Sequence, residues 1–239
     1  MDRGGAVDSD GTELNRNRLV ALAAAIALEN HQGGTVVTDS ITSIGLKKYI
    51  ENELGGIHHR FKRGYKNVIN EALRLNSVGT DTPLAIETSG HAAFMENYFL
   101  DDGAYLVTKI IIKMAMLKKQ GKTISDFLKN LEEPEESLEV RLPITKPDFR
   151  AIGNEVIEKL KLFSQMQPGW SLSPNNFEGV RVECDSKNGN GWFLLRLSVH
   201  DPIMPLNVES NLAGGVEQIL LRLKPFLAEC NDLDTSSLS

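Results

Sequence analysis

The sequence predicts an α/β protein in two parts: a three-layer, doubly wound domain with a mixed sheet, followed by a smaller α+β domain with an antiparallel sheet. In the first half, short apolar segments alternate with longer segments of helical periodicity, an order that favours a parallel sheet covered on both faces. In the second half, the Gly- and Asn-rich stretch 185–191 joins two apolar segments, as in a β-hairpin. The acidic, Pro-containing stretch 132–137 indicates a linker between the halves, or else a solvated loop within one domain.

The first half contains the elements of the predicted α/β domain. Helices are expected over 15–31, 42–54, 64–75 and 104–120, and strands over 35–39, 57–61 and 82–86. The first helix places aliphatic and small side chains at helical spacing, and Gly33 ends it. The strands are short and rich in apolar or β-branched residues, which is typical of strands buried in a parallel sheet.

The second half has a different order of elements. Strands are expected over 138–142, 179–184, 192–197 and 206–209, and helices over 148–165 and 213–229. Most of these strands follow one another without an intervening helix, so the sheet should be antiparallel with its helices on one face. The polar stretch 232–239 predicts a frayed tail.

Composition narrows the range of functions. The chain of 239 residues can bury a substantial core. A net charge of −6 and a pI near 5.5 argue against nucleic-acid binding, which normally needs a basic face. No apolar run is long enough to span a bilayer, so no membrane contact is expected. Cys184 and Cys230 are expected to be reduced thiols rather than a disulfide.

A polar loop, Glu87 to His91, directly follows the predicted strand 82–86. At the carboxyl end of a strand in an alternating α/β sheet, such side chains face the ligand crevice. Glu87 can accept hydrogen bonds from two neighbouring sugar hydroxyls, while Ser89 and His91 can donate or accept. Gly90 permits a tight turn that a larger residue would block. The alternative is an ordinary polar loop with His91 at the start of the next element.

The loop and the stretch after it resemble a known family. The pattern E-x-S-G-H at 87–91, followed by D-D-G at 101–103, is similar to the sugar-binding loop of the phosphohexomutases, the phosphoglucomutase/phosphomannomutase enzymes. The resemblance covers nearly the whole chain but only about the second half of a family member, and the chain is expected to be a divergent, plant-type one. It implies that 13–133 is the third, sugar-binding domain and 138–231 the fourth, phosphate-binding domain, with Glu87, Ser89 and His91 contacting the substrate.

The first residues also resemble part of this family. Asp2-Arg3 matches the end of the family's D-x-D-x-D-R magnesium loop, which implies that 1–12 is a remnant of the preceding domain. The resemblance implies that Asp2 is a metal ligand and that Arg3 neutralises charge in the transition state. Magnesium needs near-octahedral oxygen ligation, so one terminal carboxylate should bind it weakly or not at all. The alternative is an N-terminus unrelated to a metal loop.

A second polar stretch follows the strand 192–197. Arg196 and Ser198 point to the same side, and a guanidinium with a nearby hydroxyl suits a phosphate. The resemblance implies the family's phosphate loop, R-x-S-G-T/N-E-P, in which Arg196, Ser198 and Pro202 match but the three residues 199–201 differ. Val in place of Gly is the most serious change, because a loop that wraps phosphate with backbone N–H groups often needs Gly. The alternative is an edge strand whose Arg196 pairs with surface carboxylates such as Glu183.

Two further positions differ from many family members. Tyr65 stands where a His is common, and the segment 39–42 contains no Lys where the family often has one. The basic residues around the turn 60–66 could serve a sugar phosphate, or they could form a solvated turn.

The resemblance implies intramolecular phosphoryl transfer on a hexose phosphate such as glucose or mannose phosphate. The chain has no phosphoserine motif, so this polypeptide alone is expected to lack turnover. The alternatives are a non-catalytic sugar-phosphate-binding or interaction module, and a piece of an active four-domain enzyme. A monomer is expected, with hexose phosphate as its partner. The sequence leaves the compartment of a soluble intracellular protein open between cytoplasm and plastid.

Overall fold

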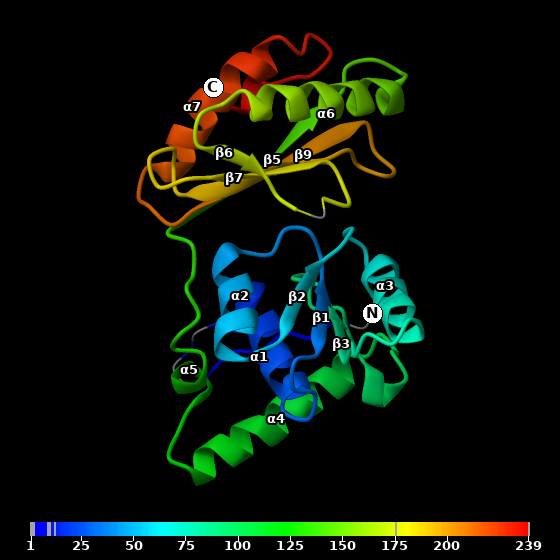
Figure 1. The fold of residues 1–239 in the computed structure, drawn as a ribbon, viewed down its shortest axis with the longest axis vertical. Helices are drawn as coiled ribbons and strands as arrows, with labels where there is room; N and C mark the ends of the chain where they lie inside the picture. Colours follow the sequence, from blue (N-terminus) through cyan, green and yellow to red (C-terminus); the bar gives the residue numbers. More distant parts are fainter. Residues whose placement is uncertain (1–2, 9–10, 12, 175, 239) are drawn as a thin grey trace. The chain divides into compact units, whose positions relative to one another are not determined.

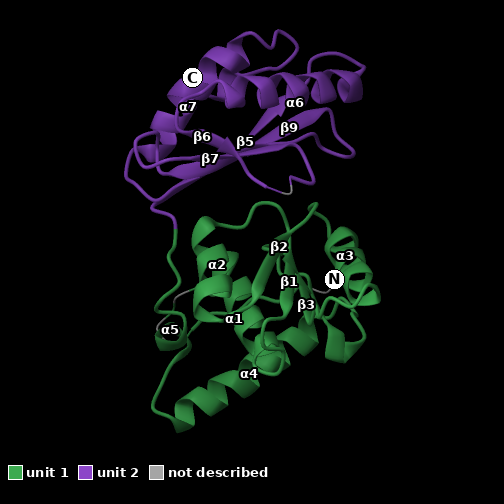
Figure 2. Ribbon diagram, in the orientation of Figure 1, with its two compact units in different colours: residues 1–133 green, residues 134–239 purple. Residues whose placement is uncertain are grey.

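The computed structural model describes residues 3–8, 11, 13–174 and 176–238. The chain forms two compact units, residues 1–133 and 134–239 (Figure 2). The first unit contains a mixed sheet and the second an antiparallel sheet, which confirms the predicted fold class. Cys184 and Cys230 are free thiols, as predicted. Among the described residues, no helix combines the length and apolar character that crossing a membrane requires.

The sheet of the first unit has the strand order β2-β1-β3-β4 (Figure 1). Its strands are β1 (Thr35–Thr38), β2 (Ile57–Arg60), β3 (Leu84–Ile86) and β4 (Ala92–Phe94). β1 pairs in parallel with both β2 and β3, whereas β4 runs antiparallel to β3. β4 was not predicted, because three apolar residues after a polar loop are too few to show a period.

Helices cover both faces of this sheet. They are α1 (Asn17–Leu28), α2 (Ile44–Lys48), the π-helical turn η1 (Tyr49–Glu53), α3 (Tyr65–Ser77), the short 3-10 turn η2 (Met95–Asn97), α4 (Gly103–Lys119) and α5 (Ile124–Phe127). On β1, Val36 packs in the core with α1, α2 and α4, while the next residue, Val37, packs with α3 on the other face. This alternation is the two-residue period of a strand, and it produces the three layers.

The first two helices differ in detail from their predictions. α1 begins at Asn17 without a side-chain cap, after Arg16 with a φ of 49°, and its residues from Leu19 onward are all buried. The helix predicted over 42–54 is divided into α2 and η1. It begins as expected, because the Ser43 side chain accepts a hydrogen bond from the Leu46 amide.

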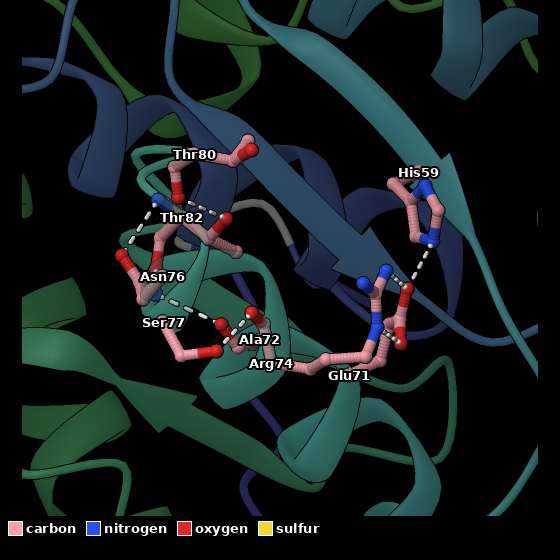
Figure 3. Close-up of polar contacts among 8 residues, drawn as sticks. All are labelled: His59, Glu71, Ala72, Arg74, Asn76, Ser77, Thr80 and Thr82. Carbon is pink, nitrogen blue, oxygen red and sulfur yellow. Dashed lines mark hydrogen bonds and ion pairs between the residues drawn. The ribbon is translucent and has the colours of Figure 1, made fainter.

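Polar contacts attach α3 to β2 and to the segment just before β3 (Figure 3). The buried Glu71 accepts hydrogen bonds from Arg74 at 2.8 and 2.7 Å and lies 3.0 Å from Nε2 of His59 on β2. At the other end of the helix, Asn76 donates to the carbonyl of Thr82 and accepts from its amide. These contacts fix the orientation of α3, whose first turn lies next to the polar loop described below.

The second unit contains a five-stranded sheet in the order β5-β9-β8-β7-β6. Its strands are β5 (Glu136–Pro143), β6 (Trp170–Leu172), β7 (Val180–Cys184), β8 (Gly191–Leu195) and β9 (Ile203–Ser210), all paired antiparallel. The helices α6 (Phe149–Gln165) and α7 (Gly215–Ala228) share one core with the sheet, on one face as predicted. β6 was not predicted, since it has only three residues.

Two other features of this unit were not apparent from the sequence. The guanidinium of Arg181 lies 3.6 Å from the ring centroid of Trp192, whose Nε1 donates to Glu209 at 2.9 Å. The prediction of a frayed tail is wrong for residues 232–238, which include the short 3-10 turn η3 (Ser236–Leu238). Leu233 and Leu238 are buried there, and the Asp234 amide donates to the carbonyl of Pro143. Apolar burial therefore holds a segment whose polar composition predicted disorder.

Candidate functional site

The loop Glu87–His91 connects the antiparallel strands β3 and β4. It is closed by two backbone hydrogen bonds, from the Glu87 amide to the His91 carbonyl and from the Gly90 amide to the Glu87 carbonyl. Gly90 has a φ of 92°, and a Cβ atom there would lie 2.3 Å from the carbonyl oxygen of Gly4. The Gly4 amide donates to the Gly90 carbonyl at 2.9 Å. The absence of a side chain at Gly90 therefore permits both the predicted tight turn and the close packing of the N-terminal segment at Gly4.

The structure brings two of the three predicted sugar contacts together. The Glu87 side chain is 4% exposed, and its Oε1 accepts a hydrogen bond of 2.6 Å from the Gly64 amide. Its Oε2 accepts from Oγ of Ser89 at 3.3 Å. A carboxylate offers about four lone-pair positions, so Glu87 retains acceptor capacity beyond these two bonds. Glu87 is thus fixed in place, while Ser89 is only half-buried.

His91 makes contacts with two different segments. Its Nδ1 lies 2.7 Å from Oδ2 of Asp101, and its Nε2 accepts a hydrogen bond of 3.1 Å from Nε of Arg3. Because Nε2 accepts, Nδ1 carries the proton and donates it to Asp101. The ring also stacks on Tyr65, with 5.0 Å between centroids. Arg3 and His91, predicted separately as functional, are therefore neighbours.

Polar groups from the ends of three parallel strands meet at this edge of the sheet. Asp39 follows β1, Gly64 follows β2, and the loop with Glu87 and Thr88 follows β3. Thr88 donates from Oγ1 to Oδ2 of Asp39 at 2.7 Å. Asp39 was not among the predicted site residues, although a carboxylate directly after a β-branched strand was a usable signal.

In the second unit, Arg196 and Ser198 follow β8 and are both half-buried. Nε of Arg196 lies 3.9 Å from Oε1 of Glu178. The edge strand proposed as the alternative is wrong, because β8 lies between β7 and β9. The other part of that alternative holds, since a carboxylate, Glu178, does lie near Arg196, whereas Glu183, given as an example, accepts from Ser173. Oγ of Ser198 accepts a hydrogen bond from the Asp201 amide at 3.3 Å. Phosphate binding by Arg196 and Ser198 stays a prediction.

The magnesium prediction rests on Asp2, which lies outside the described residues. In the part of the chain that the structure describes, no group of three or more His, Cys, Asp or Glu side chains could hold a metal ion. Magnesium usually needs several oxygen ligands, so these residues do not by themselves form such a site. No chemical step can be assigned to a metal from this arrangement.

Comparisons with known proteins agree on one family. The sequence profile of phosphoglucomutase/phosphomannomutase, alpha/beta/alpha domain III, matches residues 15–134. A phosphoglucomutase of Neisseria gonorrhoeae is 27% identical over 224 residues, covering 93% of this chain and 45% of the relative. A phosphomannomutase/phosphoglucomutase of Pseudomonas putida is 25% identical, covering 95% of this chain and 46% of the relative. The chain therefore spans less than half the length of these curated relatives.

Solved structures support the fold. A phosphoglucomutase/phosphomannomutase family protein from Burkholderia thailandensis has a TM-score of 0.74 at 24% identity, over 96% of this chain and 44% of that protein. The N-acetylphosphoglucosamine mutase of Aspergillus fumigatus, in complex with GlcNAc-6P and magnesium, has a TM-score of 0.59 at 14% identity, over 95% of this chain and 46% of that protein. The profile match covers half of the chain and contains the whole Glu87–His91 loop. The chain belongs to the phosphoglucomutase/phosphomannomutase family.

Proposed function

We propose that this chain supplies the hexose-binding and phosphate-binding part of a phosphohexomutase, which transfers a phosphoryl group within a hexose phosphate such as glucose or mannose phosphate. The observation that carries the proposal is the Glu87–His91 loop, which lies at the carboxyl edge of the parallel strands within the matched domain. In this proposal, residues 13–133 bind the sugar and residues 138–231 bind its phosphate. Residues 1–12 would correspond to the end of the family's metal loop.

Glu87 and Ser89 of the loop, and Arg3 beside it, each have a proposed role that the chemistry of the side chain permits. Glu87 accepts hydrogen bonds from two adjacent sugar hydroxyls, since its carboxylate is held by the Gly64 amide but still has free lone pairs. Ser89 adds a hydroxyl beside that carboxylate. The Arg3 guanidinium next to His91 neutralises charge on a transferring phosphoryl group.

Arg196 and Ser198 are the proposed phosphate contacts. A guanidinium can hold phosphate oxygens through two parallel N–H groups, and the Ser198 hydroxyl can supply a third donor. Val199, which replaces the family's Gly, is 66% exposed. Its side chain therefore demands no space inside the fold, although it still restricts the backbone of the loop.

We expect this chain alone to bind hexose phosphates without turnover, because it spans less than half of its relatives. A second candidate function is a non-catalytic sugar-phosphate-binding or interaction module. The changes at 199–201 in the phosphate loop, together with Tyr65 and the segment 39–42, favour it.

Calorimetry with glucose 6-phosphate and mannose 6-phosphate tests the binding proposal. E87Q should weaken binding about 10- to 100-fold, because a hydrogen bond to a charged acceptor contributes roughly 1.5–3 kcal/mol. The matched control is E51Q on η1. The Glu51 carboxylate is 4.0 Å from Lys47 in a half-exposed i,i+4 pair, and this variant should bind like the wild type. Absence of binding at millimolar ligand would refute the proposal.

A mutase assay with glucose 1,6-bisphosphate and magnesium separates the two candidate functions from a self-sufficient enzyme. Binding without turnover is expected for this chain by itself. Robust turnover would show that the 239 residues need no further domain.

A further inference from the structure

Asp39 is a buried acid at the edge of the proposed sugar site. Its residue is 0% exposed, whereas Asp is almost never fully buried unless it is paired. Oδ2 accepts the hydroxyl of Thr88 at 2.7 Å. Oδ1 is also buried and has no hydrogen-bond partner among the described residues. A buried carboxylate oxygen without a donor is costly, so the ionised form of Asp39 is poorly supported.

The charged groups that act on Asp39 come from two neighbouring segments. Glu87, from the loop after β3, adds a second negative charge, while Arg63, from the turn after β2, adds a positive one. Burial, as the largest effect, and Glu87 raise the pKa of Asp39 from 3.8 to about 7, against the opposing effects of the Thr88 hydrogen bonds and Arg63. Asp39 therefore changes between its protonated and its ionised form near neutral pH.

The geometry connects this proton to the loop. Thr88 lies between Glu87 and Ser89, so a hydrogen bond that holds its side chain also limits the movement of both neighbours. With Asp39 protonated, the Thr88 contact remains and the repulsion from Glu87 disappears. With Asp39 ionised, two carboxylates share a buried region, and opening of the loop relieves their repulsion.

We propose that Asp39 is a positioning residue for the Glu87–His91 loop, that it acts through Thr88, and that loss of its proton loosens the loop and weakens hexose-phosphate binding. This inference rests on the proposed function of the loop. Only the protonated fraction would bind well, so the apparent affinity should follow that fraction. For a group that titrates near neutrality, the fraction falls from about nine-tenths at pH 6 to about one-tenth at pH 8, which predicts about tenfold weaker binding at pH 8.

The first experiment needs no ligand. Hydrogen exchange of the amides of residues 87–91 is measured in the full 239-residue chain at pH 6 and pH 8, each rate divided by that of an unstructured peptide. In the wild type, protection should be lower at pH 8. In D39N, protection should not change with pH beyond this correction. T88V should lower protection at both pH values, and the conservative T88S should restore the wild-type behaviour.

The second experiment measures binding of glucose 6-phosphate by the same proteins at both pH values. The phosphate of the ligand also titrates, but it does so equally for all variants, so the ratio of the two dissociation constants is compared between them. This ratio should be about tenfold larger for the wild type and T88S than for D39N.

Equal pH ratios in the wild type and D39N would overturn the inference, as would loop protection that does not change with pH in the wild type. If no variant binds the sugar phosphate while the exchange data follow the prediction, the proposed function fails and the positioning role of Asp39 on the loop stands. If D39N does not fold, T88V still tests the inference: loop protection equal to that of the wild type in T88V would overturn it.

Discussion

Gly90 provides the sharpest test of how the loop and the N-terminal segment are joined. Replacing Gly90 by Ala places a side chain at a φ of 92°, which costs about 1–2 kcal/mol for an L-residue. The new Cβ would also lie 2.3 Å from the Gly4 carbonyl oxygen, a backbone atom that cannot rotate away. Moving that segment loses the Gly4–Gly90 hydrogen bond, about 0.5–1.5 kcal/mol. G90A should therefore destabilise the first unit by about 2–3 kcal/mol.

Gly79 offers a matched control. It has a φ of 85°, and no atom lies within 4 Å of a Cβ built there, so G79A meets the backbone strain without the collision. Both substitutions also reduce the entropy of the unfolded chain equally, and this contribution cancels between them. The difference between G90A and G79A, about 1 kcal/mol, then measures the contact with Gly4.

Urea denaturation can report on each unit separately. The four tyrosines lie within residues 1–133 and the two tryptophans within 134–239, so near-ultraviolet circular dichroism of Tyr reports on the first unit and Trp fluorescence on the second. G90A should shift only the Tyr transition. If G90A and G79A destabilise this unit equally, the Gly4 contact contributes nothing and the reasoning is wrong.

Three further predictions use the same measurements. The raised pKa of Asp39, about 7 against 3.8 when unfolded, means that the folded unit retains a proton that the unfolded chain releases. The free energy of unfolding should fall by up to about 4 kcal/mol as pH rises from 4 to 7, at about 1.36 kcal/mol per pKa unit. D39N should remove this pH dependence. If the pH dependence is unchanged in D39N, another titrating group causes it. E71Q should cost about 1–3 kcal/mol at pH 7, because Arg74 loses a charged acceptor, as followed by the Tyr signal. Its hydrogen bonds to Arg74 hold the pKa of Glu71 below 4.5, so this contribution is lost as pH falls below that value, and a difference that persists in acid would contradict it. W192F should cost about 1–2 kcal/mol by removing the donor to Glu209, as read from the remaining tryptophan, and an unchanged midpoint would show that this bond is neutral.

The sequence was most informative where one segment determined its own structure. The strands β1 and β3 and the helices α4 and α6 were predicted from apolar pattern and polar caps, and the side chains of Asp102 and Asp148 do accept from the first turns of those helices. The strands that were missed are β4 and β6, with three residues each. A strand this short is stabilised by hydrogen bonds to a neighbouring strand. The local sequence pattern cannot show that neighbour.

The site residues, too, were predictable only where one short segment of the chain identified them. Glu87, Ser89 and His91 were identified from one short motif, but the contacts that orient them come from residues far along the chain. Arg3 reaches His91 across 88 positions, and Thr88 reaches Asp39 across 49. For Arg196 the alternative named Glu183 as an example of a nearby carboxylate, but the ion pair forms with Glu178, because strand order in the second sheet decides which carboxylate is near.

The contact between Arg3 and His91 has a practical consequence for the recombinant protein. Arg3 is exposed, and it donates to the imidazole through a segment that is held to the loop at Gly4. An affinity tag fused ahead of it would add bulk and charge within a few residues of the imidazole. A tag placed at the other end of the chain leaves this segment unextended, and titrations made with the two versions should be compared before any affinity is ascribed to the untagged chain.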